Sequence, residues 1–212
     1  MSVIVSEIFH SIQGESTHAG RPCAFVRLTG CNLRCAWCDT THAWEEGRRM
    51  TRREVLWAVA AYGCRLVEIT GGEPLAQRET PLLVKQLLDH GYEVLVETNG
   101  SLSIKPLDPR CTAIVDVKCP SSGMSQNMDW GNLELLRGQD ELKFVLADRE
   151  DFEYAARIVR RLPNMARHIH FSPLWDTLSP RVLAGWILEE KLPVRLGLQL
   201  HKIIWDPETR GV

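Results

Sequence analysis

The 212-residue chain lacks both a large excess of one charge and any long apolar run. Its 25 basic and 27 acidic residues give a formal net charge of −2, so no global field attracts nucleic acid. No apolar stretch approaches the roughly 20 residues that span a bilayer, which argues against a membrane protein. It also lacks internal repeats, low-complexity segments and linkers. We therefore expect a single domain over residues 1–212, large enough to bury about 70% of its unfolded surface.

The chain also lacks the features of a secreted, disulfide-bonded protein. Its cysteines number seven, which is odd, and residues 1–5 contain no basic and apolar run of the secretory type. Disulfides are therefore disfavoured. We expect a cytoplasmic protein with free thiols.

What the chain does contain is three closely spaced cysteines, Cys31, Cys35 and Cys38. A four-iron cluster normally takes four thiolates, so this run would leave one iron open for reaction. Zinc is the alternative, because His42 would complete a Cys3His set. The cysteines alone do not decide between the two metals, but a chain of this length needs no zinc to stay folded.

Short apolar runs alternate with amphipathic segments along the chain. Strands are predicted for residues 3–9, 24–29, 66–70, 93–98, 113–118, 141–146, 168–171 and 194–200. Helices are predicted from the capping box at 51–54 to Gly63, and over 79–90, 149–162 and 180–190. This rhythm predicts right-handed crossovers and a parallel sheet. Because a full eightfold barrel needs about 250 residues, the expected fold is α/β, a partial, open (β/α)6-type barrel with parallel strands.

Polar residues follow three of the predicted strands. The segments are 71–74 (Gly-Gly-Glu-Pro), 97–100 (Glu-Thr-Asn-Gly) and 116–120 (Asp-Val-Lys-Cys-Pro). The first and second have ordinary explanations as turns. The carboxyl ends of parallel strands, however, converge on one mouth of a barrel. Together with the cysteine loop after residues 24–29, the three segments predict a functional site at that mouth.

Arg27 sits within an apolar strand pattern. Alternation places Phe25 and Arg27 on one face of the strand, and Ala24, Val26 and Leu28 on the other. If both faces are covered, an arginine there is costly unless an anion meets it. The alternative is an edge strand from which Arg27 reaches water. We favour an anionic ligand.

The cysteine spacing, Trp37 just before the third cysteine and the Gly-Gly-Glu-Pro segment resemble the radical S-adenosylmethionine enzymes. This resemblance implies that Cys31, Cys35 and Cys38 hold a 4Fe-4S cluster whose fourth iron is chelated by S-adenosylmethionine. Reductive cleavage of the sulfonium would then give a 5'-deoxyadenosyl radical, because in such enzymes the cofactor carries the hard chemistry and the protein positions it.

Residues 6–16, 20–30, 38–40 and 198–205 resemble the 7-carboxy-7-deazaguanine synthase family over nearly the whole chain. That family converts 6-carboxy-5,6,7,8-tetrahydropterin to 7-carboxy-7-deazaguanine on the route to queuosine and other 7-deazapurines. Abstraction of the C6 hydrogen starts a radical ring contraction that expels ammonia, and S-adenosylmethionine is regenerated. The resemblance also implies a homodimer.

The resemblance assigns residues to the cofactors and to the substrate. Thr40 would bind Mg²⁺ shared with the substrate. The S-adenosylmethionine site would comprise Gly71, Gly72, Glu73, Cys119, Pro120, Ser121, Ser172, Pro173, Leu174 and Trp175, with the Glu73 side chain at the methionine amino group. The substrate site would comprise Ile12, Gln13, Gly14, Glu15, Arg27, Thr70, His201 and the terminal Val212, with Arg27 on the substrate carboxylate. No residue is predicted to be catalytic in its own right.

Two segments depart from the family pattern. The family often has Ser-Pro-Lys where this chain has Cys119-Pro120-Ser121, and the register of the tail, residues 206–212, is not fixed by the sequence. Two other functions stay open: a glycyl-radical activase of the same superfamily, and a zinc-stabilised binding module without chemistry. The segments 12–15 and 200–202 argue against the activase, and the Gly-Gly-Glu-Pro segment argues against the module.

Four arginines, Arg48, Arg49, Arg52 and Arg53, are expected at a helix start. Cations there oppose the helix dipole. The usual interpretation is a solvated face. The alternative is a docking patch for an acidic electron donor such as flavodoxin, since charge complementarity raises association rates.

Overall fold

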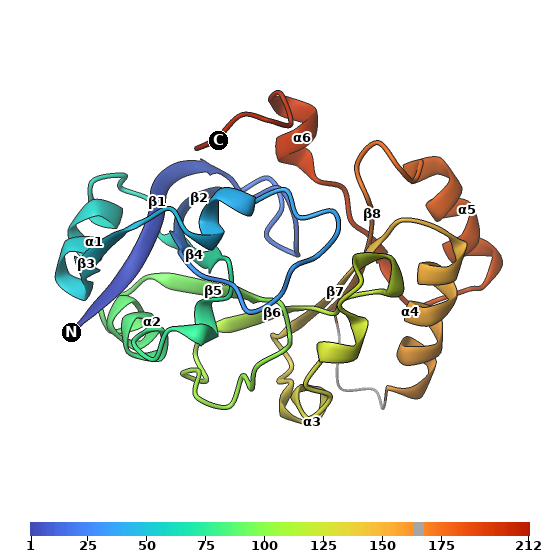
Figure 1. Ribbon diagram of the computed structural model, residues 1–212, viewed down its shortest axis with the longest axis horizontal. Coiled ribbons are helices and arrows are strands. Elements are labelled where there is room, and N and C mark those ends of the chain that lie inside the picture. The colour runs from blue at the N-terminus through green and yellow to red at the C-terminus, as the bar shows by residue number, and fades with distance from the viewer. Residues whose placement is uncertain (163–167) are drawn as a thin grey trace.

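The computed structural model describes residues 1–162 and 168–212. These residues form one curved sheet with the strand order β3-β1-β2-β4-β5-β6-β7-β8-β9 (Figure 1). Its strands are β1 (Ser2–Ile12), β2 (Pro22–Leu28), β3 (Arg48–Thr51), β4 (Leu66–Gly71), β5 (Glu93–Thr98), β6 (Thr112–Asp116), β7 (Glu141–Leu146), β8 (His168–Pro173) and β9 (Arg195–Leu196). Neighbours from β2 to β9 are parallel, whereas β1 is antiparallel to both β2 and β3.

Six α-helices accompany the sheet in the described part of the chain. They are α1 (Arg52–Ala60), α2 (Thr80–Asp89), α3 (Asn132–Leu135), α4 (Arg149–Arg161), α5 (Pro180–Glu189) and α6 (Leu200–Ile204). In Figure 1, α1 and α2 lie beside one end of the sheet and α4 and α5 beside the other. The predicted capping box is confirmed, because the Thr51 hydroxyl accepts the Glu54 N–H and the Glu54 carboxylate accepts the Thr51 N–H. Among the described residues, no helix is both long and apolar enough to cross a membrane.

The predicted open barrel is confirmed. Six full-length parallel strands, β2 and β4 to β8, carry the βα rhythm. β3 and β9 are the edge strands of the sheet and do not pair with each other in the described part of the chain, so the barrel stays open. β2 lies between β1 and β4, so the interpretation of Arg27 as an edge-strand residue is wrong.

Two details of the prediction are wrong. The strand expected over 194–200 is only Arg195–Leu196, and Leu200 already begins α6. At Gly197 the chain approaches β8 so closely that a Cβ there would lie 2.5 Å from the Ser172 hydroxyl. Beyond Gly197 the chain leaves the sheet and forms a hydrogen bond with the loop after β1. Arg48 and Arg49 lie in β3 rather than at the start of α1; this strand was missed because only Met50 of its four side chains is buried.

The sheet separates an apolar core from a polar interior. Its outer face packs under the helices, while its inner face carries a small apolar layer formed by Phe9, Cys23, Phe25, Leu66, Leu95 and Ile114. Two residues further along their strands come Arg27, Glu68, Glu97 and Asp116. Because side chains alternate along a strand, these charged groups share the inner face and stand above the apolar layer.

Candidate active site

One open cavity lies inside the curved sheet, towards the carboxyl ends of its parallel strands. It encloses about 1250 Å³, a volume that includes space open to solvent. Of the predicted residues, its lining includes Ile12, Gln13, Gly14, Glu15, Arg27, Cys31, Cys35, Cys38, Thr40, Thr70, Gly71, Gly72, Leu174, His201 and Val212. The structure thus brings the predicted substrate residues and the three cysteines to one cavity.

The three cysteines lie in the loop after β2 as free, half-buried thiols. Cys31 Sγ accepts the Leu33 N–H at 3.4 Å and lies 3.6 Å from the Asn99 amide nitrogen, a second donor. Hydrogen bonds to the sulfurs are among the features that set the reduction potential of protein-bound iron–sulfur clusters. Three free thiols that face one cavity therefore fit a cluster with one iron left open to a ligand.

Zinc fits the same loop poorly. The predicted fourth ligand, His42, instead places its Nε2 3.3 Å from Glu7 Oε1. In the described parts of the chain, no three His, Cys, Asp or Glu side chains surround a single point as ligands of one metal ion. A cluster spreads its three cysteine ligands over three irons, whereas zinc draws its ligands to one centre.

Gly71 and Gly72 fit the end of β4 against the cysteine loop. A Cβ on Gly71 would lie 2.1 Å from the Leu28 carbonyl oxygen, and one on Gly72 would lie 2.2 Å from that of Gly30. The Gly72 N–H donates to the Leu28 carbonyl at 3.0 Å, and the Glu73 N–H donates to that of Gly30 at 2.8 Å. The two glycines thus support the loop that carries the thiols, besides exposing backbone to the cavity.

Replacing Gly72 by alanine should displace the cysteine loop. Its neighbour is backbone, which cannot yield as a flexible side chain can, so we expect the reconstituted variant to hold less than about half the iron of the unsubstituted protein, by analogy with strained core overpacking. Iron and sulfide assays after anaerobic reconstitution measure this. Gly138→Ala is the control, since its added Cβ would meet nothing within 4 Å. Normal iron content in Gly72→Ala would show that the loop accommodates the methyl group.

Glu73 lies behind the cavity wall. Its buried carboxylate accepts the Leu75 N–H at 2.8 Å, the Thr98 hydroxyl at 2.9 Å and the Asn99 N–H at 2.7 Å. Burial raises the pKa of Glu73, and this effect outweighs the hydrogen bonds, which lower it. The carboxylate ties the end of β4 to the end of β5, and its side chain does not line the cavity.

Other predicted cofactor residues also lie outside the lining of the cavity. They are Cys119, Pro120, Ser121, Ser172, Pro173 and Trp175. Burial raises the pKa of the Cys119 thiol well above its usual range, which keeps this sulfur protonated. Ser121 donates its N–H and its hydroxyl to Asp151, at 2.9 and 2.5 Å. It also accepts the Trp37 indole N–H at 3.2 Å, which connects the segment 119–121 to the cysteine loop.

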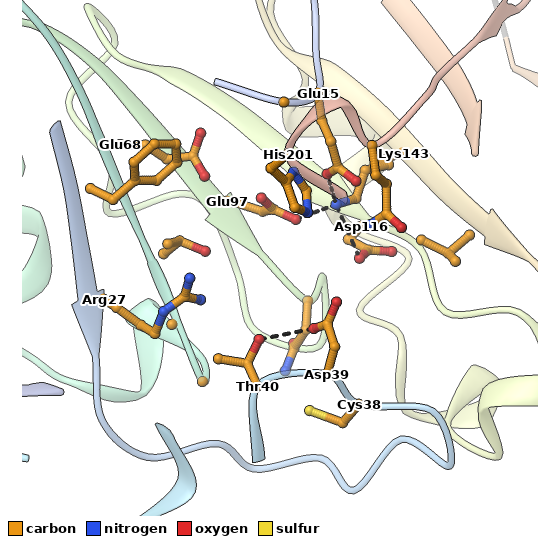
Figure 2. A pocket seen from close by; sticks show the side chains of 18 of the residues that line it. Glu15, Arg27, Cys38, Asp39, Thr40, Glu68, Glu97, Asp116, Lys143 and His201 are labelled. Atoms are coloured by element: carbon orange, nitrogen blue, oxygen red, sulfur yellow. Dashed lines mark hydrogen bonds and ion pairs between the residues drawn. The ribbon is translucent and has the colours of Figure 1, made fainter. Parts of the chain in front are cut away.

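A buried lysine gathers the carboxylates of the cavity. Lys143 Nζ lies 2.6 Å from Glu15 and 3.7 Å from Asp116, and it also contacts Glu97 (Figure 2). Asp116 has a second cation, because Lys118 binds it at 2.8 Å. Burial opposes the charge on Lys143, yet the surrounding carboxylates raise its pKa well above the usual value. Burial would likewise raise the pKa of Glu15, but Lys143 holds it at about 2.

Glu68 differs from these ionised groups. Burial raises its pKa well above the ordinary value, and the charge of Glu97 adds to the rise. Its carboxyl group contacts the Gln13 side-chain amide. A carboxyl that stays protonated in this position offers a donor as well as an acceptor.

Thr40 and Arg27 both line the cavity and lie near each other in Figure 2. The Thr40 hydroxyl donates to Asp39 Oδ1 at 2.9 Å, and Lys202 binds the other oxygen of Asp39 at 2.8 Å. A carboxylate therefore lies directly beside the Thr40 hydroxyl, and its other oxygen is bound by a lysine. Arg27 donates its Nε to Glu7 at 2.7 Å, and its guanidinium points into the cavity.

The tail closes one side of the cavity. The Leu200 N–H donates to the Gly14 carbonyl at 3.0 Å, and a Cβ on Gly14 would lie 2.2 Å from His201 Nδ1. Burial lowers the pKa of His201, which favours its neutral form. An exposed ion pair of 3.1 Å links Arg210 of the tail to Glu46, and Val212 lines the cavity.

Two charged residues of the cavity, Glu68 and Lys143, were not predicted from the sequence, whereas Glu97, Asp116 and Lys118 lie in the predicted segments 97–100 and 116–120. A signal was present in the sequence. Lys143 stands within the strand 141–146, which is buried throughout, and Glu68 occupies a similar position in β4. The reasoning that selected Arg27, a charge on a covered strand face, applies equally to these two residues.

An open parallel barrel with three free thiols in the loop after its first parallel strand defines a radical S-adenosylmethionine enzyme, and the sequence pattern of the Radical SAM superfamily matches residues 25–114. The chain is 45% identical to 7-carboxy-7-deazaguanine synthase of Koribacter versatilis (strain Ellin345) over 98% of this chain and 99% of that protein. It is 46% identical to the synthase of the same name from Chlorobaculum tepidum over 98% of this chain and 96% of that protein. The crystal structure of QueE from Escherichia coli superposes with a TM-score of 0.80 at 25% identity, covering 94% of each chain.

The chain belongs to the 7-carboxy-7-deazaguanine synthase family. It is therefore an enzyme, and membership of the radical S-adenosylmethionine superfamily implies a 4Fe-4S cluster and S-adenosylmethionine as its cofactors. The family argues against both alternatives from the sequence, the glycyl-radical activase and the zinc-stabilised module.

Proposed function

We propose that the enzyme converts 6-carboxy-5,6,7,8-tetrahydropterin to 7-carboxy-7-deazaguanine with loss of ammonia, a lyase step on the queuosine route of tRNA modification. The supporting observation is the cavity itself, which joins the cysteine loop to a set of charged groups suited to a polar heterocycle that carries a carboxylate. The cluster and S-adenosylmethionine, when bound, supply the radical that abstracts a substrate hydrogen.

We propose that the chain's own residues fix the substrate by complementary charge. The guanidinium of Arg27 has its Nη groups directed into the cavity and can receive the substrate carboxylate in bidentate fashion. Glu15, ionised and held by Lys143, and the backbone of residues 12–14 offer acceptors to the ring N–H groups of a pterin. Thr70, His201 and the Val212 carboxylate complete the enclosure.

The cofactor site is proposed in the same cavity, beside the cysteine loop. Cys31, Cys35 and Cys38 would hold the cluster, and the backbone at Gly71 and Gly72, which lines the cavity, would meet the methionine amino group. Glu73 would orient that backbone rather than bind the amino group itself, because its carboxylate already accepts three protein donors. The adenosine part would lie along segments 119–121 and 172–175, of which Leu174 reaches the cavity.

We also propose Mg²⁺ at Thr40, shared with the substrate. Asp39 lies beside the Thr40 hydroxyl, and a carboxylate with a hydroxyl and substrate oxygens forms the all-oxygen environment that Mg²⁺ prefers.

We further propose that residues 1–212 form one domain, that the enzyme is a homodimer and that it is cytoplasmic. The cytoplasmic location is in keeping with seven free cysteines and a reducing compartment. Sedimentation velocity tests the dimer directly.

The deciding experiment uses anaerobically purified, reconstituted enzyme with dithionite, S-adenosylmethionine and the tetrahydropterin, with and without Mg²⁺. Product of the mass of 7-carboxy-7-deazaguanine is expected, with a higher rate when Mg²⁺ is present. Formation of 5'-deoxyadenosine without any deazapurine would contradict the proposed substrate while leaving the superfamily unaffected. A rate that is independent of Mg²⁺ after chelation would contradict the metal site alone.

The electron donor is proposed to be a flavodoxin that docks on arginines near the cysteine loop. Arg48 and Arg49 are exposed in β3, where Arg48 pairs with Val5, and Val5 in turn pairs with Leu28 just before that loop. Arg53 is exposed and stacks on Trp57, which is 58% exposed, at 4.4 Å. Arg52 is partly neutralised by Glu79 at 3.6 Å, so Arg48, Arg49 and Arg53 form the free part of the patch.

Reversing Arg48 and Arg49 to glutamate should slow turnover with reduced flavodoxin about tenfold or more at low salt, because steering by complementary charge sets the association rate. Turnover with dithionite should not change. Reversal of two exposed arginines of α4, Arg157→Glu together with Arg161→Glu, is a control of equal charge change. Equal slowing with both reductants, or by the control variant, would contradict the docking patch.

A further inference from the structure

A buried carboxylate that does not line the cavity holds the loop after β1. Glu141, the first residue of β7, is 0% exposed. Its Oε1 accepts the Thr17 hydroxyl at 2.6 Å, and its Oε2 accepts the Thr17 backbone N–H at 3.1 Å. An ionised group is costly to bury without partners, so both contacts have a structural reason to persist.

The neighbouring strand supplies the other partner of this carboxylate. His170 on β8 is 5% exposed, and its Nε2 lies 2.8 Å from Glu141 Oε2. Burial alone would raise the pKa of Glu141, but its contacts with His170 and Thr17 hold it below the ordinary value. The acceptor for Thr17 is therefore a charged one, and hydrogen bonds to charged acceptors are stronger than those to neutral groups.

Residues of β7 and of the loop after β1 contact each other at the same spacing of two residues. Glu141 and Lys143 lie two residues apart on β7 and so share one face of the sheet. They bind Thr17 and Glu15, which are two residues apart on the loop. Ser16 between them has a φ of 64°, a left-handed conformation that a non-glycine residue keeps only when its surroundings enforce it. Two adjacent anchors on one strand provide that enforcement.

We propose that Thr17, Glu141 and His170 form a positioning clamp that fixes residues 13–15 for substrate binding. The inference rests on the proposed function, which places Gln13 and Glu15 at the substrate. The clamp does not touch the reacting atoms. It fixes the position along β7 at which Glu15 contacts Lys143. It also fixes the orientation of the backbone of residues 13–15, which faces the cavity.

The test is the isosteric change Thr17→Val, which removes the hydroxyl donor from an exposed residue and leaves the core intact. We expect the KM for the tetrahydropterin to rise about tenfold, the effect of losing one hydrogen bond to a charged acceptor. The KM for S-adenosylmethionine and the cluster absorption should stay unchanged. Thr17→Ser, which keeps the hydroxyl, should remain within about twofold of the unsubstituted enzyme.

Glu93→Gln is the matched control, because Glu93, the first residue of β5, contacts the same loop through Arg21. Glu93 binds Arg21 at 2.6 Å at the far end of the loop, but both side chains are nearly half exposed, and such pairs contribute little. This variant should leave both KM values unchanged. A substrate KM within twofold of normal in Thr17→Val, or a Ser variant as impaired as the Val variant, would overturn the clamp.

Hydrogen exchange of the ligand-free, reconstituted enzyme gives a readout that does not depend on the substrate. The amides of residues 13–17 should exchange faster in Thr17→Val than in the unsubstituted enzyme or in Glu93→Gln. Unchanged exchange would contradict the clamp itself. Failure of the unsubstituted enzyme to form the deazapurine would contradict the proposed function and leave the exchange result standing.

Discussion

Cys35→Ala should abolish both the cluster and the activity. A cluster of four irons normally has four protein thiolates, and the proposed cluster would have three. The variant leaves only two thiolates in the loop, which are too few to bind the cluster. After reconstitution, we expect iron to fall from about four atoms per chain to near zero. The broad visible absorption should disappear, as should formation of 5'-deoxyadenosine and of any deazapurine.

Cys64→Ala is the control for this change. Cys64 is also a half-buried free thiol, but it does not line the cavity, and its Sγ contacts the Pro22 carbonyl at 3.0 Å. We expect normal iron content and turnover in this variant. Full iron and activity in Cys35→Ala, or loss of both in Cys64→Ala, would show that the cluster is not held by the loop 31–38.

The positions of the site residues could be predicted wherever a local pattern carries them. The cysteine spacing, the Gly-Gly-Glu-Pro segment and the placement of Arg27 on a covered strand are all readable in short windows of sequence. They converge in space because parallel strands bring their carboxyl ends to one edge. The open barrel followed from the same alternation of strands and helices.

The rest depends on contacts between distant segments. The role of Glu73 in tying β4 to β5 depends on Thr98 and Asn99, 25 and 26 residues away, and no local pattern reports this. Likewise, the sequence assigns Gly71 and Gly72 to the S-adenosylmethionine site, but their closest contacts are with the end of β2 and the start of the cysteine loop. The short strand β3 has too few buried side chains for its sequence to show the alternation of buried and exposed residues that is typical of a strand.

Lys143→Met should be the most damaging single change in the cavity outside the cysteines. Lys143 is 7% exposed and is the cation shared by Glu15, Glu97 and Asp116. Removing one partner of a buried ion pair costs about 3–5 kcal/mol, because the remaining charge stays buried without compensation. Substrate binding should fail as well, since Glu15 loses the contact that positions it. Urea unfolding and the product assay measure the two effects.

Two further variants separate charge from packing. Lys85→Met removes an exposed lysine that binds Asp89 at 2.7 Å, and it should cost no more than about 1 kcal/mol. Lys143→Met combined with Glu15→Gln removes one of the uncompensated charges, so it should recover part of the lost stability without recovering activity. A double variant no more stable than Lys143→Met would show that the packing of the lysine side chain, rather than its charge, matters.

The pH dependence of the Lys143→Met effect follows from Glu15. Its pKa is about 2 in the folded enzyme against an ordinary value of 4.5, so this depressed pKa contributes stability that is fully present above pH 4.5 and is lost as the pH falls through 2. The variant lacks this contribution and gains stability when its carboxylates are protonated. The difference in unfolding free energy between the two proteins should therefore be largest above about pH 5 and should shrink towards pH 2. A constant difference across this range would mean that Lys143 does not hold Glu15 in its ionised form.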